Sequence, residues 1–497
     1  MLKKDSLTQS LCLTEYKKEI SLLREKLFDK QRQFRDKRTS SLLLVVGGFD
    51  GIAKHDTTNT IANWMDPRGL STYDFSRNIN SELERPEFWK YWKTLPAKGE
   101  IRIYLGAWCD RPFYEKAYRN IDLKKYEQYL SRIEALEKQL ALDGTIIIKL
   151  WISISKSEYI KRIHNLKEDP LKRWCVSKTD EKQALSYEQF KNSSDHLLEK
   201  TNYSFCKWHL IEGDNAKRRT IAVAQVFENL LNCHQNRRTM LKKELKSTLP
   251  KKNKNVYVTT SKLDLGKHLD KSAYKKKIEK YRRRLHELSI QMIKKDLSTV
   301  IVFEGVDAAG KGGAIQRMIV AFDAPRYRVI PISKPNEEES KYHYLWRFWK
   351  HVPTNGMITI FDRSYYGRVL VERIEEFATK EEWNRAYSEI NDFEEQLLEN
   401  NTAVIKFWIQ ISKDEQLKRF RARQNNPHKN WKINEEDWRN REKWEQYEEA
   451  SRTMIELTST DFAPWTIVEG NDKRFARVKV IKTVCQQLEK AINGATV

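Results

Sequence analysis

Residues 299–303 read TVIVF, and residues 305–313 read GVDAAGKGG. The apolar run is typical of a buried strand, and the glycine-rich segment has the G-x-x-x-x-G-K pattern of a phosphate-binding loop. Residues 314–319 follow with helical spacing, so the loop has the strand–loop–helix setting that such a loop requires, which disfavours a mere glycine-rich turn before a lysine. Backbone N–H groups and the helix N-terminus would face phosphate oxygens. The candidate phosphate-binding positions are Gly305, Gly310, Lys311, Gly312 and Gly313.

The sequence also indicates where a metal would bind. Gly312 stands where this type of loop commonly has a Ser or Thr that binds Mg²⁺, so other side chains must hold the ion. Asp307 lies inside the loop, and Asp362 follows an apolar run at 358–361, as an acidic Mg²⁺ ligand after a strand should. Two carboxylates near one phosphate can place one or two Mg²⁺ ions across the transferring group. The alternative for Asp362 is a structural salt bridge, for example with Arg363.

A third, strongly basic segment covers residues 416–423 and continues through 427–432. Its charge fits two interpretations equally well, a solvated helix face or a mobile lid whose cations surround a transferring phosphoryl group. The phosphate-binding loop upstream favours the lid.

The two halves of the chain align without a gap at an offset of 257 residues. This offset superposes Gly48 on Gly305, Lys54 on Lys311 and Trp92 on Trp349, among many other glycines and tryptophans. A constant offset of this length indicates a duplicated domain. We predict domains at residues 1–245 and 256–497, separated by a lysine-rich linker around 247–255.

Both halves alternate apolar runs with helical stretches, which predicts a parallel sheet covered by helices on both faces. A basic helix is expected before the first strand of each half, over about residues 12–39 in the first. The expected strands are residues 42–46, 101–105 and 146–154, then 299–303, 358–361 and 404–411.

The first half lacks parts of the phosphate-binding machinery. Ala53 and His55 replace two loop glycines, and Leu105-Gly106 replaces Asp362-Arg363. Side chains in the loop would crowd the phosphate or resist its backbone angles. The basic segment also loses cations, with His164 and Leu166 in place of Arg421 and Arg423. We predict a first copy with little or no phosphoryl-transfer activity, in which Asp50, Lys54 and residues 170–174 are relics or an anion-binding remnant.

Composition narrows the class of partner. The formal net charge of +23 attracts polyanions, and nucleic acid, acidic membranes and polyphosphate would all respond to it. No apolar run reaches the ~18 residues of a membrane helix, and the N-terminus lacks the apolar core of a signal peptide. Six scattered cysteines without a Cys-x-x-Cys pair indicate reduced thiols and the cytoplasm, and Cys109 is expected to be a buried structural residue.

Taken together, the loop, the segment 361–368 reading FDRSYYGR with Val371-Glu372-Arg373, the Arg-Phe-x-Ala-Arg pattern at 419–423 and Trp431-Lys432 resemble the polyphosphate kinase 2 family. The match covers about residues 260–490. The resemblance implies a thymidylate kinase-like fold, a P-loop three-layer α/β/α domain with a helical lid. Tandem fused copies resemble the subgroup that transfers a phosphoryl group from inorganic polyphosphate to AMP, giving ADP, with Mg²⁺.

The resemblance also implies roles for individual residues. Asp307 and Asp362 would organise metal and phosphate, and Lys311 and Arg363 would stabilise the transferring phosphoryl group. Arg317 would lie on the polyphosphate path. The other residues it implies are Arg419, Arg423 and Lys432 in the lid, and Tyr366 and Arg368 on the nucleotide side.

Two alternatives remain at this stage. An ordinary ATP-dependent nucleoside monophosphate kinase would share the loop and lid but would not require so basic a protein. A non-enzymatic polyanion-binding protein could use the 15 tryptophans to stack bases, yet the tryptophan pairs repeat at helical spacing, which is more typical of core positions. We therefore expect polyphosphate and AMP or ADP as partners, no nucleic acid and no membrane. Assembly into a homo-oligomer is left open.

Overall fold

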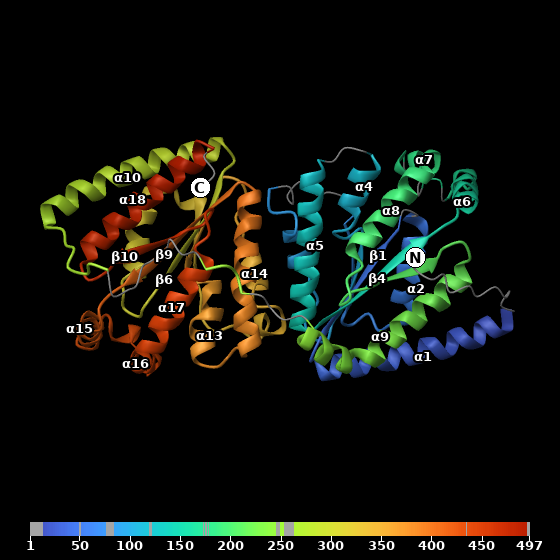
Figure 1. Ribbon diagram of the computed structural model, residues 1–497, viewed down its shortest axis with the longest axis horizontal. Coiled ribbons are helices and arrows are strands. Elements are labelled where there is room, and N and C mark those ends of the chain that lie inside the picture. The colour runs from blue at the N-terminus through green and yellow to red at the C-terminus, as the bar shows by residue number, and fades with distance from the viewer. Residues whose placement is uncertain are drawn as a thin grey trace. The chain divides into compact units, whose positions relative to one another are not determined.

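The computed structural model describes residues 13–48, 51–75, 84–118, 122–171, 173, 176, 178–244, 249–252, 263–433 and 435–494. It divides into two compact units, one made mainly of residues before 247 and the other mainly of residues from 247 on. Each unit contains a five-stranded sheet (Figure 1). The strands are β1 (Ser41–Gly47), β2 (Leu70–Asp74), β3 (Ile101–Leu105), β4 (Thr145–Ser153) and β5 (Trp208–Glu212), then β6 (Ser298–Gly305), β7 (Tyr327–Pro331), β8 (Ile358–Asp362), β9 (Thr402–Gln410) and β10 (Trp465–Glu469).

Helices connect the strands in both halves. In the first half they are α1 (Leu13–Lys37), α2 (Gly51–Trp64), α3 (Trp89–Lys93), α4 (Asp110–Ala117), α5 (Leu123–Asp143), α6 (Lys156–Glu168), α7 (Lys178–Leu185), α8 (Tyr187–Thr201) and α9 (Ala216–Glu244). In the second they are α10 (Lys271–Lys294), α11 (Lys311–Met318), α12 (Trp346–Trp349), α13 (Val371–Ile374), α14 (Lys380–Glu399), α15 (Lys413–Gln424), α16 (Glu435–Glu442), α17 (Trp444–Thr458) and α18 (Lys473–Ile492). Short 3-10 turns include η4 (Ile319–Ala321), η7 (Tyr365–Val369) and η8 (Asn430–Lys432).

The two sheets have the same topology. Their strand orders, β2-β3-β1-β4-β5 and β7-β8-β6-β9-β10, are identical, and every pairing is parallel. The register is identical too, because Leu42 pairs with Ile101 in the first sheet and Thr299 with Ile358 in the second, each 257 residues later. The predicted α/β fold, the duplication and the six expected strands are confirmed, with strand ends shifted by at most two residues.

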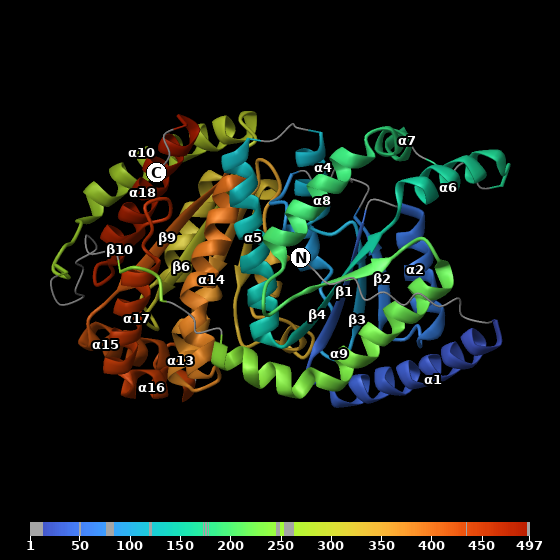
Figure 2. The same cartoon turned by 45° about the vertical axis from the view of Figure 1, so that its right-hand side comes forward.

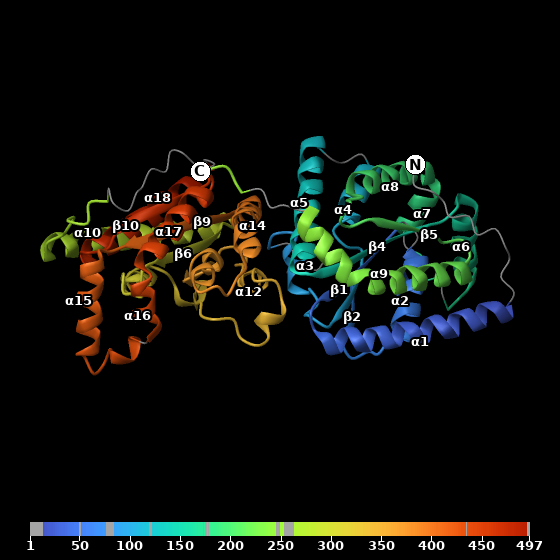
Figure 3. The same cartoon turned by 60° about the horizontal axis from the view of Figure 1, so that its bottom comes forward.

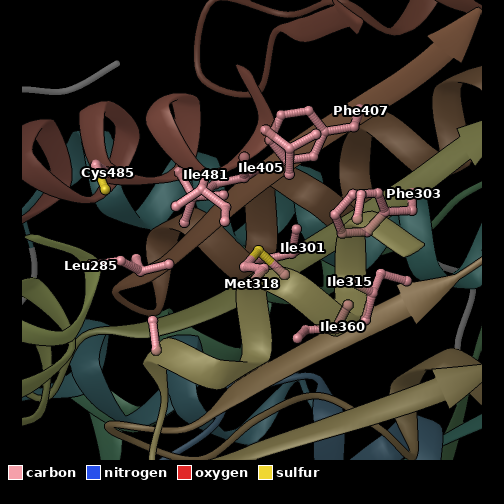
Figure 4. Packing of buried hydrophobic residues seen from close by; sticks show 14 of the residues in the cluster. Leu285, Ile301, Phe303, Ile315, Met318, Ile360, Ile405, Phe407, Ile481 and Cys485 are labelled. Carbon is pink, nitrogen blue, oxygen red and sulfur yellow. The ribbon is translucent and has the colours of Figure 1, made fainter. Parts of the chain in front are cut away.

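Helices cover both faces of the second sheet, as Figures 1 and 2 show. Because side chains alternate along a strand, β9 directs Ile405 and Phe407 to one face and Lys406 to the other. The first face packs against α10, α11 and α18 in a continuous apolar core. Figure 4 shows this core around Ile301 and Phe303 of β6, with Met318 beside Ile301 and with Ile481 and Leu285 farther to the left. The opposite face packs against α14.

The opposite face of each sheet contains a buried lysine. Lys406 Nζ lies 2.6 Å from Glu394 of α14 and 2.7 Å from the Thr458 carbonyl, and both charged side chains are fully buried. In the first copy Lys149 makes the same contacts, 2.7 Å to Glu137 and 2.7 Å to the Thr201 carbonyl. A buried ion pair of this kind persists only when its remaining hydrogen-bonding groups are satisfied. It fixes α14 against β9, and α5 against β4, in both copies.

None of the described helices is long and apolar enough to span a membrane. Cys109, Cys206 and Cys485 are buried free thiols, so the structural reading of Cys109 is confirmed.

Replacing Lys406 by Met removes the cation but leaves Glu394 buried without its counter-ion. We expect a loss of about 3–5 kcal/mol in the free energy of unfolding, measured by urea denaturation. The exposed Lys280 on α10 provides the control, because Lys280→Met should change stability by less than about 0.5 kcal/mol. Equal effects of the two substitutions would contradict a buried ion pair in the second unit.

Candidate active site

The predicted phosphate-binding loop lies between β6 and α11, at the carboxyl edge of the sheet. Gly310 begins the helix with φ of 110°, and Ala308 adopts a φ of 60° that non-glycine residues seldom take. Lys311 is the first helical residue, and its ammonium group donates to the carbonyl of Gly305 at 2.7 Å. Burial lowers the pKa of Lys311, and the positive charge of Arg363 lowers it further. The loop therefore holds a partly desolvated cation at the N-terminus of a helix.

Asp307 is the centre of a hydrogen-bonded network. Its Oδ1 accepts from Arg363 Nη2 at 2.8 Å, and its Oδ2 accepts from Asn440 Nδ2 of α16 at 2.8 Å. Burial acts to raise the pKa of Asp307, but the charges of Arg363 and Lys311 and these hydrogen bonds outweigh it, so the pKa lies below its usual range. Both carboxylate oxygens are thus engaged by protein donors. Asp307 orients Arg363 and joins the loop to α16.

Asp362 ends β8 beside the loop. A β-carbon placed on Gly312 would lie 3.6 Å from Asp362 Oδ2, so the glycine leaves open space next to this carboxylate. Among the described residues the Asp362 side chain forms no hydrogen bond or ion pair, and no cluster of three or more His, Cys, Asp or Glu side chains could hold a metal. Mg²⁺ is commonly held by one or two carboxylates together with substrate phosphates. Asp362 fits that donor set, and each oxygen of Asp307 already accepts one hydrogen bond, from Arg363 or from Asn440.

Arg419 lies beneath the loop and is almost completely buried. Its guanidinium donates to the carbonyls of Ala308 and Ala309 at 3.0 and 2.8 Å and to those of Gly470 and Asn471 at 2.7 and 2.9 Å. Glu415 accepts from its Nε. In the first copy Arg162, the counterpart of Arg419, still donates to the Gly213 carbonyl at 3.2 Å. Arg419 therefore supports the loop from below, although the sequence assigned it to the lid.

The basic segment lies on α15 and the turn η8, and α16 follows it. α15 and α16 project from the second unit (Figure 3). Arg423 near the end of α15 is half-buried, and Trp431 in η8 is 74% exposed. The Lys432 side chain lies outside the described residues. α16 reaches the loop through Asn440, so this helical projection is physically connected to the phosphate-binding loop, as a lid must be.

Two predicted nucleotide-side residues occupy different surroundings. Tyr366 is fully buried, donates to Glu394 and accepts from Lys406, so its position does not support direct contact with a nucleotide. Arg368 forms a salt bridge with Glu372 at 3.2 Å and lies over the Tyr344 ring.

Arg317, at the end of α11, is half-buried. Gly313 lies against Arg477 of α18, whose Nη2 would be 3.4 Å from a β-carbon there.

Two site residues were not singled out from the sequence. Glu304 is buried at the end of β6 and accepts from Ser364 at 2.8 Å, and burial raises its pKa. Asn440 holds Asp307 from α16. A comparison of the two copies could have identified Glu304 and Asn440, because the first half has Gly47 and Gln183 at these positions.

The loop lysine of the first copy, Lys54, lies beside a carboxylate of the protein itself. Lys54 is buried and lies 3.8 Å from Asp110 of α4, and burial raises the pKa of this carboxyl. The second copy has Gly367 at the position of Asp110. Leu105 and Gly106 end β3 without a carboxylate or a guanidinium. Asp50 and parts of the segment 170–174 lie outside the described residues. An internal carboxylate thus takes the place beside Lys54 that a phosphate would need.

Comparison with known proteins agrees with this geometry. The family model described as polyphosphate kinase 2 matches residues 11–239 and again residues 268–494. This chain belongs to the polyphosphate kinase 2 family. It carries two tandem domains of that family, which together account for most of its length.

Full-length relatives share the tandem arrangement. A polyphosphate:AMP phosphotransferase of Pseudomonas aeruginosa is 40% identical over 481 residues, covering 96% of both chains. A protein of the same name from Acinetobacter johnsonii is 34% identical and covers 90% of this chain and 91% of its own. A crystal structure assigned to polyphosphate kinase 2, also from Pseudomonas aeruginosa, superposes with a TM-score of 0.86 at 38% identity over 98% of each chain.

Substituting Arg419 by Lys keeps the charge but cannot satisfy four carbonyls at once. We expect a loss of roughly 2–3 kcal/mol in stability, together with weaker phosphate binding because the loop loses its support. Urea denaturation measures the first effect. Arg421→Lys, on the exposed side of the same helix, should leave stability unchanged, and a similar loss in both variants would argue against the role of Arg419 beneath the loop.

Proposed function

We propose that this protein is a polyphosphate:AMP phosphotransferase, which moves the terminal phosphoryl group of inorganic polyphosphate to AMP. The observation that carries this proposal is the match of full-length relatives with that name over 96% of the chain, both copies included. The formal charge of +23 supports a polymeric anion as the donor. We also propose the cytoplasm as its location, in keeping with buried free thiols.

The reaction needs alignment and charge stabilisation rather than covalent help. A phosphate oxygen of AMP attacks the terminal phosphorus of polyphosphate, and a new P–O–P link forms. The bond from that phosphorus to the bridging oxygen breaks, and the bridging oxygen remains on the shortened polymer as an anion. The nucleophile is already ionised, so no general base is required. Transferring oxygens and the leaving anion carry the negative charge that the site must stabilise.

The residues divide this task among them. Lys311 and the N–H groups at the start of α11 bind the transferring phosphoryl group, and Arg363 stabilises its charge. Asp307 is a positioning residue, because its two oxygens orient Arg363 and Asn440. We assign Mg²⁺ binding to Asp362 together with substrate oxygens. Bound Mg²⁺ would neutralise charge on the donor and acceptor phosphates.

We assign catalysis to residues 256–497 and propose that the copy at residues 1–245 is inactive. Lys54 beside Asp110 and the loss of Asp362-Arg363 support this division. The first copy keeps its core, its sheet register and its buried Lys149–Glu137 pair. These features give it a structural role.

The direct test is an incubation of the purified protein with Mg²⁺, AMP and long-chain polyphosphate, without ATP, followed by chromatography. We expect ADP, and we expect EDTA to prevent its formation. Asp362→Asn should reduce kcat/KM at least about 100-fold, whereas Asp323→Asn, at an exposed site in the same unit, should not. Turnover with ATP but not with polyphosphate would instead identify a nucleoside monophosphate kinase.

The duplicated loop supplies a matched pair of substitutions. Lys311→Ala should lower kcat/KM by about 10²–10³, because a preorganised cation at the transferring phosphoryl group is lost. Lys54→Ala removes the equivalent residue of the first copy and should leave kcat/KM unchanged. Comparable losses in the two variants would place catalysis in both copies.

A further inference from the structure

A groove of about 600 Å³ lies on the second unit, between α10 and the turn η4 that follows α11. Ile278 and Ala321, both buried, form its apolar floor, and Val320 stands exposed at its rim. The α10 wall contributes residues at positions 275, 279, 282, 283 and 286, which share one side of the helix. The groove does not include the P-loop, and the catalytic residues proposed above do not line it.

The wall is cationic. Lys275, Arg282 and Arg283 line it against a single carboxylate, Glu279. Glu279 lies 3.6 Å from Arg283, and both side chains are 75% exposed. It offsets one of the three positive charges, so the wall keeps a net charge of about +2. His286 closes one end, with Nδ1 lying 3.2 Å from the carbonyl of Ala321. From Lys275 to Arg283 the cations thus extend over about 12 Å of helix at a rise of 1.5 Å per residue.

The groove begins where α11 ends. Arg282 Nε donates to the carbonyl of Arg317 at 2.9 Å, which ties the α10 wall to the last turn of α11. The same helix begins at Lys311, so about 9 Å of helix separates the phosphate site from this junction. A polymer whose terminal phosphate lies at Lys311 therefore has a cationic surface within reach, by way of Arg317.

The lining chemistry selects among polyanions. Single-stranded nucleic acids are usually held by aromatic side chains that stack on the bases as well as by cations. Apart from Glu279, the residues that line this groove are cationic or aliphatic, with His286 as the single ring and its Nδ1 near a backbone carbonyl. A polymer without bases needs only the charge and the length of the groove.

We propose that this groove is a second binding site for polyphosphate, which holds the part of a long chain distant from the reacting end. The inference rests on the proposed function. Such a site increases affinity for long chains without adding a contact at the reacting phosphate, because the second contact is intramolecular once the first has formed.

The test compares two double variants of α10 that lose the same charge. Lys275→Ala with Arg283→Ala removes the exposed cations of the groove. Lys277→Ala with Lys280→Ala removes two exposed lysines that, at 100° per residue, project from the other side of the helix. In the groove variant, KM for long-chain polyphosphate should rise roughly five- to tenfold, since each exposed ionic contact contributes up to about 1 kcal/mol. The ratio of this KM to the KM for tetrapolyphosphate should rise by the same factor.

The control variant should keep the wild-type ratio. An equal rise of KM in both variants would indicate that polyphosphate responds to the general positive charge of α10 and not to the groove. An unchanged KM in the groove variant would also overturn the proposal. Titration of the wild type and of both double variants with long-chain polyphosphate, without AMP, measures binding separately from phosphoryl transfer. If no ADP forms with either polymer, the proposed function fails, while a binding loss confined to the groove variant still supports the groove. Displacement by single-stranded RNA as effective as by polyphosphate would assign the groove to nucleic acid instead.

Discussion

The close approach of two backbones at the end of β6 underlies the geometry of the active site. Gly305 has a φ of 144°, and a β-carbon there would collide with the carbonyl oxygen of Ile409 in β9. Only glycine permits this close approach of the two backbones, after which the chain leaves the sheet and forms the loop over its carboxyl edge. The first copy has the same arrangement, because a β-carbon on Gly48 would meet the carbonyl oxygen of Ile152. This close approach positions the loop, Lys311 and the start of α11.

Duplication separates the residues that build the fold from those that perform chemistry. Both copies have the glycine at the close approach of the two strands, the parallel register and the buried Lys–Glu pair. Arg162 keeps two of the carbonyl contacts of Arg419, to Gly213 and Asp214, so this arginine belongs with the structural residues. Glu304, Asp362 and Arg363 changed together in the first half. The two copies thus share the contacts that hold the fold and differ in residues to which we assign phosphoryl transfer.

Charge balance explains how the site tolerates so many ionised groups at the edge of a sheet. Asp307 holds the pKa of Arg363 above its usual value, and Arg363 and Lys311 together keep Asp307 ionised despite its burial. Among the described residues Lys311 forms no ion pair within 4.0 Å, and burial lowers its pKa, so an incoming phosphate would stabilise its charge. In the first copy Asp110 supplies the opposite charge to Lys54 from within the protein. A side chain thus faces the loop lysine in the first copy, where we propose that a substrate phosphate does so in the second.

The sequence alone determined the features that local pattern encodes. The apolar runs predicted the central strands, the glycine spacing predicted the loop, and the offset of 257 residues indicated the duplication. The four edge strands β2, β5, β7 and β10 were not foreseen, because each is only five residues long and polar residues interrupt its apolar ones. Tertiary structure decided which partners meet across long separations in the chain. It placed Asn440 on Asp307, Arg419 beneath the loop and Tyr366 in the core beside Lys406, since hydrogen bonds between residues tens to more than a hundred positions apart leave no periodic trace in a sequence.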